Sequence, residues 1–297
     1  KFVFTFLFYI FSIFILTEDT KAKSLNKEKF LKSYDKIEQE ITNNKKFTKN
    51  NYDQLLNLNN KYDVFNLKIE KWTKGNFFFY LCDGSQKFEI YRENILVFCE
   101  QSDRIYTKHN LYKEKNMKEI EYYISGTLSL QYAWKYYYSK NHKHLKLSKK
   151  FIKKNLKLKN SKKNIWHYYA ALKANSIINR SDLKYKDAIK NQRLILDLFK
   201  CDEDIINKII CHEELSNFAV LLMDTSTSIN NEKANKILMR ILNSENKKNF
   251  KEDNRRAVRV ALYSYHMSNF NFEDAEKYIS DSIQYINTLD KRGTEDY

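Results

Sequence analysis

The chain has 297 residues, enough for one large or two ordinary domains, and its 42% apolar and 15% aromatic content excludes a wholly disordered protein. The absence of Pro and the presence of only four Gly exclude collagen-like and Pro-rich architectures and leave few residues for phosphate-binding loops, so helices are expected to dominate. The net charge of +16 is uneven, because residues 181–297 hold 18 basic and 20 acidic groups, whereas residues 140–180 hold 13 Lys and Arg and no acid.

The first 22 residues have the pattern of a secretory signal. Lys1 precedes an apolar run at 2–16 that only Thr5 and Ser12 interrupt, and a polar stretch ending in Ala22 follows. A basic start, a short apolar centre and a small residue at the cleavage site are typical of such signals. A spanning helix needs about 20 apolar residues, so we expect cleavage after Ala22 and export to the periplasm or the medium. An uncleaved membrane anchor is the alternative.

Residues 23–116 are predicted to form a small α+β module. Two helices are expected at 23–61, since apolar residues recur there at the spacing of one helical face: Phe30, Leu31, Tyr34, Ile37 and Ile41. Five short runs then predict the strands of an antiparallel meander, at 64–69, 77–82, 87–91, 95–99 and 104–107. The Asp-Gly pair at 83–84, between two apolar runs, is the best hairpin signal in the chain.

The remaining residues, 117–297, are predicted to form a helical-hairpin domain, so the fold class is mainly α. Four helix pairs are expected, at 119–139 with 144–159, 164–178 with 183–200, 204–225 with 231–243, and 252–268 with 272–288. In the second helix of the last three pairs, charged or polar residues precede a small residue, which is Ala188, Ala234 or Ala275.

The last of these pairs resembles a tetratricopeptide repeat. Small residues at Ala257, Ala261 and Ala275 and an aromatic residue before the second helix, Phe270, match the pattern of that family. The resemblance covers about residues 164–289 and implies antiparallel helix pairs with a concave ligand face. The three second-helix alanines lie 46 and 41 residues apart, compared with about 34 in the family.

Four cysteines would permit two disulfides in an exported chain: Cys82, Cys99, Cys201 and Cys211. In a meander, a middle strand would separate Cys82 from Cys99 by about 9.6 Å, beyond the reach of about 7 Å, unless a bulge or another strand order intervenes. Cys201 and Cys211 would lie about 15 Å apart in one helix, and about two turns out of level across a helical hairpin. Disulfides within each pair and buried free thiols both stay open.

No motif for a catalytic or cofactor site stands out. The glycine-rich phosphate and dinucleotide loops and the nucleophile-elbow motif do not occur in the sequence. His212 and Glu213 begin a zinc-protease pattern, but Ser216 stands where the second His is required. We therefore predict no cofactor, no metal and no enzymatic activity. A hydrolase whose catalytic residues meet only in the folded chain is one alternative.

A basic segment at 140–163 holds 11 Lys in 24 residues. Leu145, Ile152 and Leu156 share one face of the predicted helix, and this face is expected to pack in the array. The lysines then either face water or bind an anionic lipid or envelope polymer. Aromatic residues nearby suggest a groove of aromatic and lysine side chains. The predicted binding residues are Trp134, Lys149, Lys150, Lys153, Lys154, Trp166 and Tyr169.

These features predict an exported, non-catalytic scaffold or adaptor that binds protein partners through a helical-repeat surface. The alternative is a peripheral envelope or membrane-surface protein attached through the basic helix at 140–163. Nucleic acid is disfavoured as a partner, because export separates the chain from it and the segment is rich in Lys rather than Arg. High salt weakens electrostatic attachment, whereas it does not weaken binding in a groove that buries apolar surface.

Overall fold

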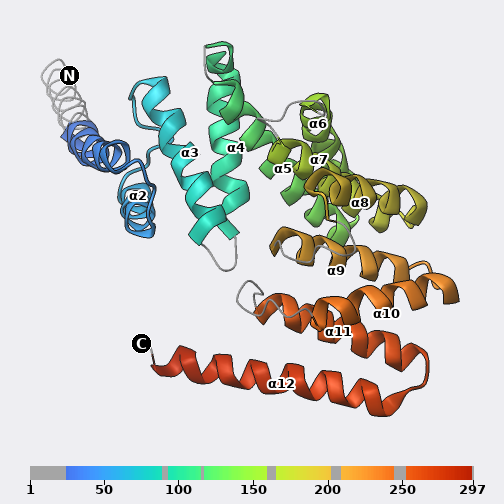
Figure 1. The fold of residues 1–297 in the computed structure, drawn as a ribbon. Coiled ribbons are helices and arrows are strands. Elements are labelled where there is room, and N and C mark those ends of the chain that lie inside the picture. Colours follow the sequence, from blue (N-terminus) through green and yellow to red (C-terminus); the bar gives the residue numbers. More distant parts are fainter. Residues whose placement is uncertain are drawn as a thin grey trace, which may run out of the picture. The chain divides into compact units, whose positions relative to one another are not determined.

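The computed structural model describes residues 25–88, 93–114, 117–158, 165–201, 209–243 and 252–295, and most of them are helical (Figure 1). The chain forms two compact units, Lys1–Gln131 and Tyr132–Tyr297. The first contains a helix at 25–44, α2 (Lys49–Lys61), α3 (Lys71–Phe88), α4 (Glu93–Lys108), η1 (Leu111–Lys113) and the start of α5 (Lys118–Ser139). The second contains the end of α5, α6 (His142–Asn155), η2 (Leu156–Leu158), α7 (Ile165–Ser181), α8 (Tyr185–Phe199), α9 (Ile209–Met223), α10 (Ser228–Leu242), α11 (Glu252–Ser268) and α12 (Phe272–Glu295).

The predicted meander is wrong, and the α+β module with it. Of the five expected strands, 77–82 lies in α3, 95–99 and 104–107 lie in α4, and 64–69 forms turns and irregular backbone. Of the fifth, 87–91, the first two residues end α3 and the other three fall outside the described residues. The buried residues of α3 include Phe77, Phe78, Leu81 and Cys82, which cluster on one face of a helix. A short apolar run has the same appearance in a buried helix as in a buried strand, so periodicity alone could not distinguish them.

The Asp-Gly pair expected to form a hairpin turn lies inside α3. A Cβ atom added to Gly84 would lie 2.7 Å from Tyr52 Cγ, so the glycine allows α2 to pack tightly against α3. The Asp83 carboxylate accepts a hydrogen bond from Tyr123 Oη at 2.6 Å and pairs with Lys87 Nζ at 2.7 Å. Both residues therefore serve helix packing rather than a turn.

The core of the first unit is rich in aromatic residues. Phe30 and Tyr34, on the predicted inner face of helix 25–44, are buried, and both rings contact Phe77 of α3, with centroids 5.3 and 5.7 Å apart. Helix α2 adds the buried residues Tyr52 and Leu55. The first two helices are thus correctly predicted. They pack against helices, whereas the sequence predicted that they would pack against strands.

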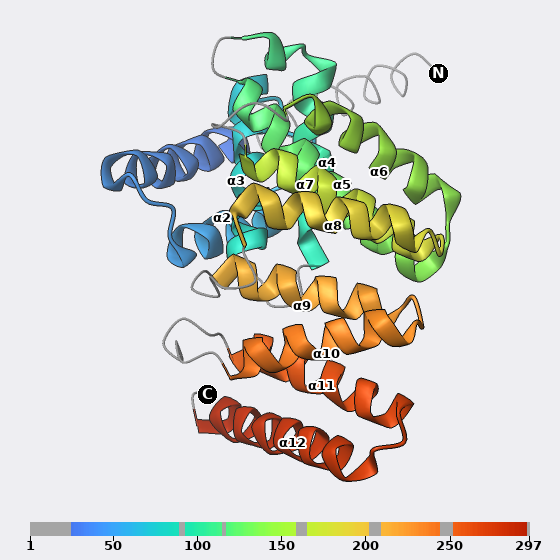
Figure 2. The same cartoon turned by 45° about the vertical axis from the view of Figure 1, so that its right-hand side comes forward.

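The second unit is an array of helical hairpins. Helix α7 packs on α8, α9 on α10 and α11 on α12, and α9 also packs on α11. Figure 2 shows α9 to α12 stacked in chain order. The small residues Ala188, Ala234 and Ala275 are fully buried in α8, α10 and α12. This arrangement confirms the mainly α, helical-hairpin character of the domain and is consistent with a helical-repeat fold.

The hairpin turns recur at a regular interval. Four turn residues have left-handed backbone, Lys140, Leu183, Ser226 and Phe270, with φ between 53° and 60°. They follow α5, α7, α9 and α11, and they lie 43, 43 and 44 residues apart. This period is longer than the roughly 34 residues of a tetratricopeptide repeat and falls within the range of about 40–47 residues of other helical repeats.

Both cysteine pairs form disulfides in the structure. Cys82 of α3 bonds to Cys99 of α4, with their Cα atoms 4.8 Å apart. Cys201, just after α8, bonds to Cys211 of α9, with a Cα separation of 5.3 Å. The separation expected for Cys82 and Cys99 does not apply, because they link two helices rather than strands of a meander. Cys201 and Cys211 do not lie in one helix, and the offset of about two turns expected across a helical hairpin is absent.

No helix within the described part of the chain is long and apolar enough to span a membrane. The predicted signal segment, residues 1–22, lies outside the described residues.

Candidate binding groove

One face of α7 carries large polar and aromatic side chains at helical spacing. Trp166, Tyr169, Lys173, Ile177 and Arg180 follow one another every three or four residues. Other faces of the helix are occupied by packing, since its three alanines and two further apolar side chains are buried in the array: Ala170, Ala171, Ala174, Leu172 and Ile178. The spacing of residues in α7 thus leaves one side of the helix, from Trp166 to Arg180, to line a groove.

A buried carboxylate on α9 is bonded to this face of α7. The Glu214 side chain has no exposed surface, and its Oε1 accepts hydrogen bonds from Tyr169 Oη at 2.7 Å and Lys173 Nζ at 2.6 Å. Its Oε2 accepts from Lys173 Nζ at 2.8 Å and from Gln192 Nε2 of α8 at 2.6 Å. One carboxylate therefore joins α7, α8 and α9, and its charge is compensated in place.

A second ion pair joins Arg180 of α7 to Asp224, just after the end of α9. Arg180 Nε and Nη2 contact the Asp224 carboxylate at 2.5 and 3.2 Å, and the guanidinium lies 5.8 Å from the centroid of the Tyr137 ring of α5. Because Arg180 is paired with Asp224 and Lys173 with Glu214, neither cation is left as an uncompensated charge in the groove.

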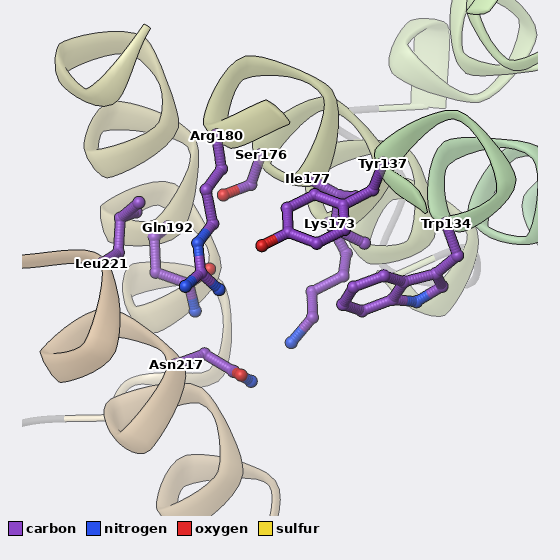
Figure 3. Close-up of a pocket in the computed structure, with 9 residues that line it drawn as sticks. All are labelled: Trp134, Tyr137, Lys173, Ser176, Ile177, Arg180, Gln192, Asn217 and Leu221. Carbon is purple, nitrogen blue, oxygen red and sulfur yellow. The ribbon is translucent and has the colours of Figure 1, made fainter. Parts of the chain in front are cut away.

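The groove lies between α5, α7, α8 and α9 (Figure 3). Trp134 and Tyr137 reach it from α5, while Asn217 and Leu221 reach it from α9 on the other side. The complete lining is Trp134, Tyr137, Lys173, Ser176, Ile177, Arg180, Gln192, Asn217 and Leu221. The cavity volume is about 40 Å³, far below the roughly 300–1,000 Å³ of small-molecule sites. The groove thus fits a single inserted side chain rather than an enclosed metabolite.

The phenol of Tyr169 stays protonated in this environment. Burial, followed by the negative charges of Glu214 and Glu213, raises the pKa of Tyr169 above its ordinary value. A protonated phenol can donate to the carboxylate, which agrees with its short contact to Glu214. Tyr169 therefore supports the wall of the groove.

The predicted binding residues separate into two surfaces. Trp134 lines the groove and is 37% exposed. Tyr169 lies behind the groove wall on Glu214, and Trp166, 57% exposed, contacts the rings of Tyr169 and Phe199 at 5.9 and 5.1 Å. The four predicted lysines lie on α6 and do not line the cavity: Lys149, Lys150, Lys153 and Lys154.

Sequence reasoning missed Tyr137, Arg180, Glu214, Gln192 and Asn217. The three- and four-residue spacing from Trp166 to Arg180 was a usable signal for one wall of the groove. No local pattern identified Glu214, because its partners come from helices that meet only in the folded chain.

The zinc-protease pattern that His212 and Glu213 begin does not form a metal site. His212 is buried and Glu213 is exposed, so the two side chains point in different directions. Across the ranges that the structure describes, no group of three or more His, Cys, Asp or Glu residues is placed to hold a metal ion.

Comparison with models of known protein families finds no match, and searches of curated proteins and of solved structures likewise find none.

Proposed function

We propose that this protein is a non-catalytic scaffold or adaptor that binds a segment of a partner protein in the groove between α5, α7 and α9. The observation that carries the proposal is the state of the side chains along this face. Its cations are paired with carboxylates, whereas Trp134 and Tyr138 of α5 stay 37% and 78% exposed and stack on each other, with ring centroids 6.0 Å apart.

A surface of this kind favours apolar and aromatic contacts over charge. Aromatic side chains dominate the energetics of many protein interfaces, and their contacts do not depend strongly on salt. The cavity beside Trp134 has room for one inserted side chain, which is how an anchor residue of a partner binds. We therefore expect a partner segment with a small apolar anchor.

We also propose that the protein works outside the cytosol, in the periplasm or after secretion. Two disulfides in a chain of this size are typical of oxidising compartments. The predicted N-terminal signal agrees with this location. Mass spectrometry of the protein purified without reductant, before and after reduction, tests whether all four cysteines are oxidised.

Site-specific photocrosslinking tests the groove. A photoreactive amino acid is placed at Trp134 or Asn217 and, as matched controls, at the exposed residue Arg193 on α8 or Lys236 on α10. After crosslinking in the source cells, the proposal predicts a discrete protein adduct from the groove positions that persists in high salt. Equal adducts from the control positions, or none from the groove, would contradict it.

A point variant separates the groove from the fold. Tyr137→Ala removes one aromatic ring of the groove wall while leaving Glu214 and its partners in place. We expect the crosslink from position 217 to decrease, with an unchanged circular dichroism spectrum. An undiminished crosslink would show that the partner does not bind in this groove.

A further inference from the structure

The helix α6 presents lysine along one side only. Its seven lysines, counted through η2, fall within an arc of about 140° when successive residues are placed about 100° apart. We call this surface the α6 lysine face: Lys143, Lys146, Lys149, Lys150, Lys153, Lys154 and Lys157. Residues 140–181 contain no Asp or Glu, so neither α6 nor the following α7 offers an acidic side chain to it.

The opposite side of α6 is packed into the array. Ser148, Phe151, Ile152 and Asn155 are buried, and the ring of Phe151 stacks on Tyr132 with centroids 6.2 Å apart. Asn155 Nδ2 donates to a main-chain oxygen of α7, that of His167, at 3.3 Å. The helix therefore cannot turn its apolar side outward, and the lysine face is the surface that it offers to other molecules.

The lysines at the centre of this face are solvated. Lys149, Lys150 and Lys153 are exposed, and no carboxylate of the described residues lies within ion-pair distance of any of them. By contrast, Lys173 and Arg180 in the groove are both paired. Carboxylates thus compensate the two groove cations but not these three lysines of α6.

We propose that the α6 lysine face docks electrostatically on the surface of an anionic lipid bilayer. The face extends about 21 Å along one side of the helix, and its positive charge complements a layer of anionic headgroup phosphates. The lysine ammonium is a compact point charge that is attracted to an anionic surface without fixed geometry, whereas bidentate recognition of individual phosphates prefers Arg, and α6 contains none. Leu156, 37% exposed at the edge of the face, can contact the headgroup region.

This surface is separate from the groove, so the two proposals can fail independently. Attachment through α6 depends on charge and should weaken as ionic strength rises. The groove proposal, by contrast, predicts binding that persists in high salt.

Sedimentation with lipid vesicles tests the proposal on the full chain. The probes are phosphatidylcholine vesicles with and without about 30% phosphatidylglycerol, at about 50 and about 500 mM salt. Because the apolar run at 2–16 can bind vesicles of either charge, the quantity to compare is the gain in binding caused by the anionic lipid. We expect a gain of at least about tenfold at low salt that disappears at high salt.

A pair of charge-matched variants locates the surface. Lys146, Lys149, Lys150 and Lys153→Gln neutralises the face, whereas Lys184, Lys186, Lys190 and Lys277→Gln removes the same charge elsewhere in the unit. Each lysine near an anionic surface contributes about fivefold, so the first variant should lose the gain entirely and the second should change it little. Circular dichroism checks that both variants are folded.

Equal losses in the two variants would overturn the proposal, because net charge rather than α6 would then govern binding. Failure of the wild-type chain to distinguish anionic from neutral vesicles would overturn it as well. The proposal is also refuted if soluble polyphosphate competes fully at equal phosphate concentration, since the ligand would then be a free polyanion and not a bilayer.

Discussion

Replacing Glu214 by Leu tests whether the buried ion pair joins α7, α8 and α9 as described. The side chain is fully buried and accepts four hydrogen bonds, two of them from Lys173, whose own side chain is 12% exposed. Removing the carboxylate leaves the ammonium buried without its counter-charge. Breaking a buried pair from one side typically costs about 3–5 kcal/mol of unfolding free energy.

Lys173→Met is the complementary change, because it leaves Glu214 charged and buried with only Tyr169 and Gln192 as donors. We expect a similar loss of about 3–5 kcal/mol. In the double variant no buried charge is left unpaired, so its destabilisation should be smaller than the sum of the single effects by about 2–3 kcal/mol.

Urea unfolding followed by circular dichroism measures the three variants against the wild type, with the disulfides intact. Tyr137→Ala, on the same groove but outside the ion pair, controls for general sensitivity of this region. A loss below about 1 kcal/mol for Glu214→Leu, or strictly additive effects in the double variant, would refute the reasoning, because a surface-like pair behaves in that way.

Two further predictions concern packing and pH. Gly84→Ala should destabilise the first unit by about 1–3 kcal/mol, because the new methyl would collide with Tyr52. Gly75→Ala, whose Cβ would lie 3.2 Å from Tyr106, should lower the stability less in the same thermal melt. Equal losses of stability would contradict the packing argument. Burial and then Glu214 raise the pKa of Tyr169 above the 10.0 of a free phenol, so above that pH the unfolded chain releases a proton that the folded chain keeps. The unfolding free energy should therefore fall with rising pH by up to about 1.4 kcal/mol per unit for this group. Urea midpoints at about pH 8 and pH 11 should show a smaller fall for Tyr169→Phe, and an identical fall would exclude this contribution.

The helices that sequence analysis located correctly are those with long apolar stripes. Phe30, Tyr34 and Ile37 recur over several turns, and an alternating strand pattern cannot imitate that spacing. The error at 64–107 arose where apolar runs were only about five residues long and turn-like residues separated them. Gly84 was read as a turn signal, yet its role depends on Tyr52, which lies 32 positions earlier and contacts it only in the folded unit.

The groove was predictable only in part, for a similar reason. Trp134 and Tyr169 could be identified from the density of aromatic residues, but the residue that joins the helices, Glu214, lies among ordinary helical residues in the sequence. The sequence spacing of Ala188, Ala234 and Ala275 did not reveal the repeat period either. It becomes visible in the left-handed turn residues, because backbone geometry repeats even where residue types differ, as Lys140, Leu183 and Phe270 do.

The placement of the lysines bears on whether the positive charge of this chain reflects composition or function. A bias toward Lys codons raises the number of lysines, and packing sends them to the outside of any amphipathic helix. Neither effect removes acidic residues from the same surface, and α8 and α12, which are also amphipathic, both carry Asp or Glu among their polar residues. The segment 140–181 contains no acidic residue in either α6 or α7. Its groove cations therefore pair with carboxylates from elsewhere, Lys173 with Glu214 of α9 and Arg180 with Asp224 just after α9. Glu214 and Asp224 thus neutralise the groove cations, whereas α6 has no acidic residue in its own segment, so high salt should weaken binding at α6 and leave binding in the groove little changed.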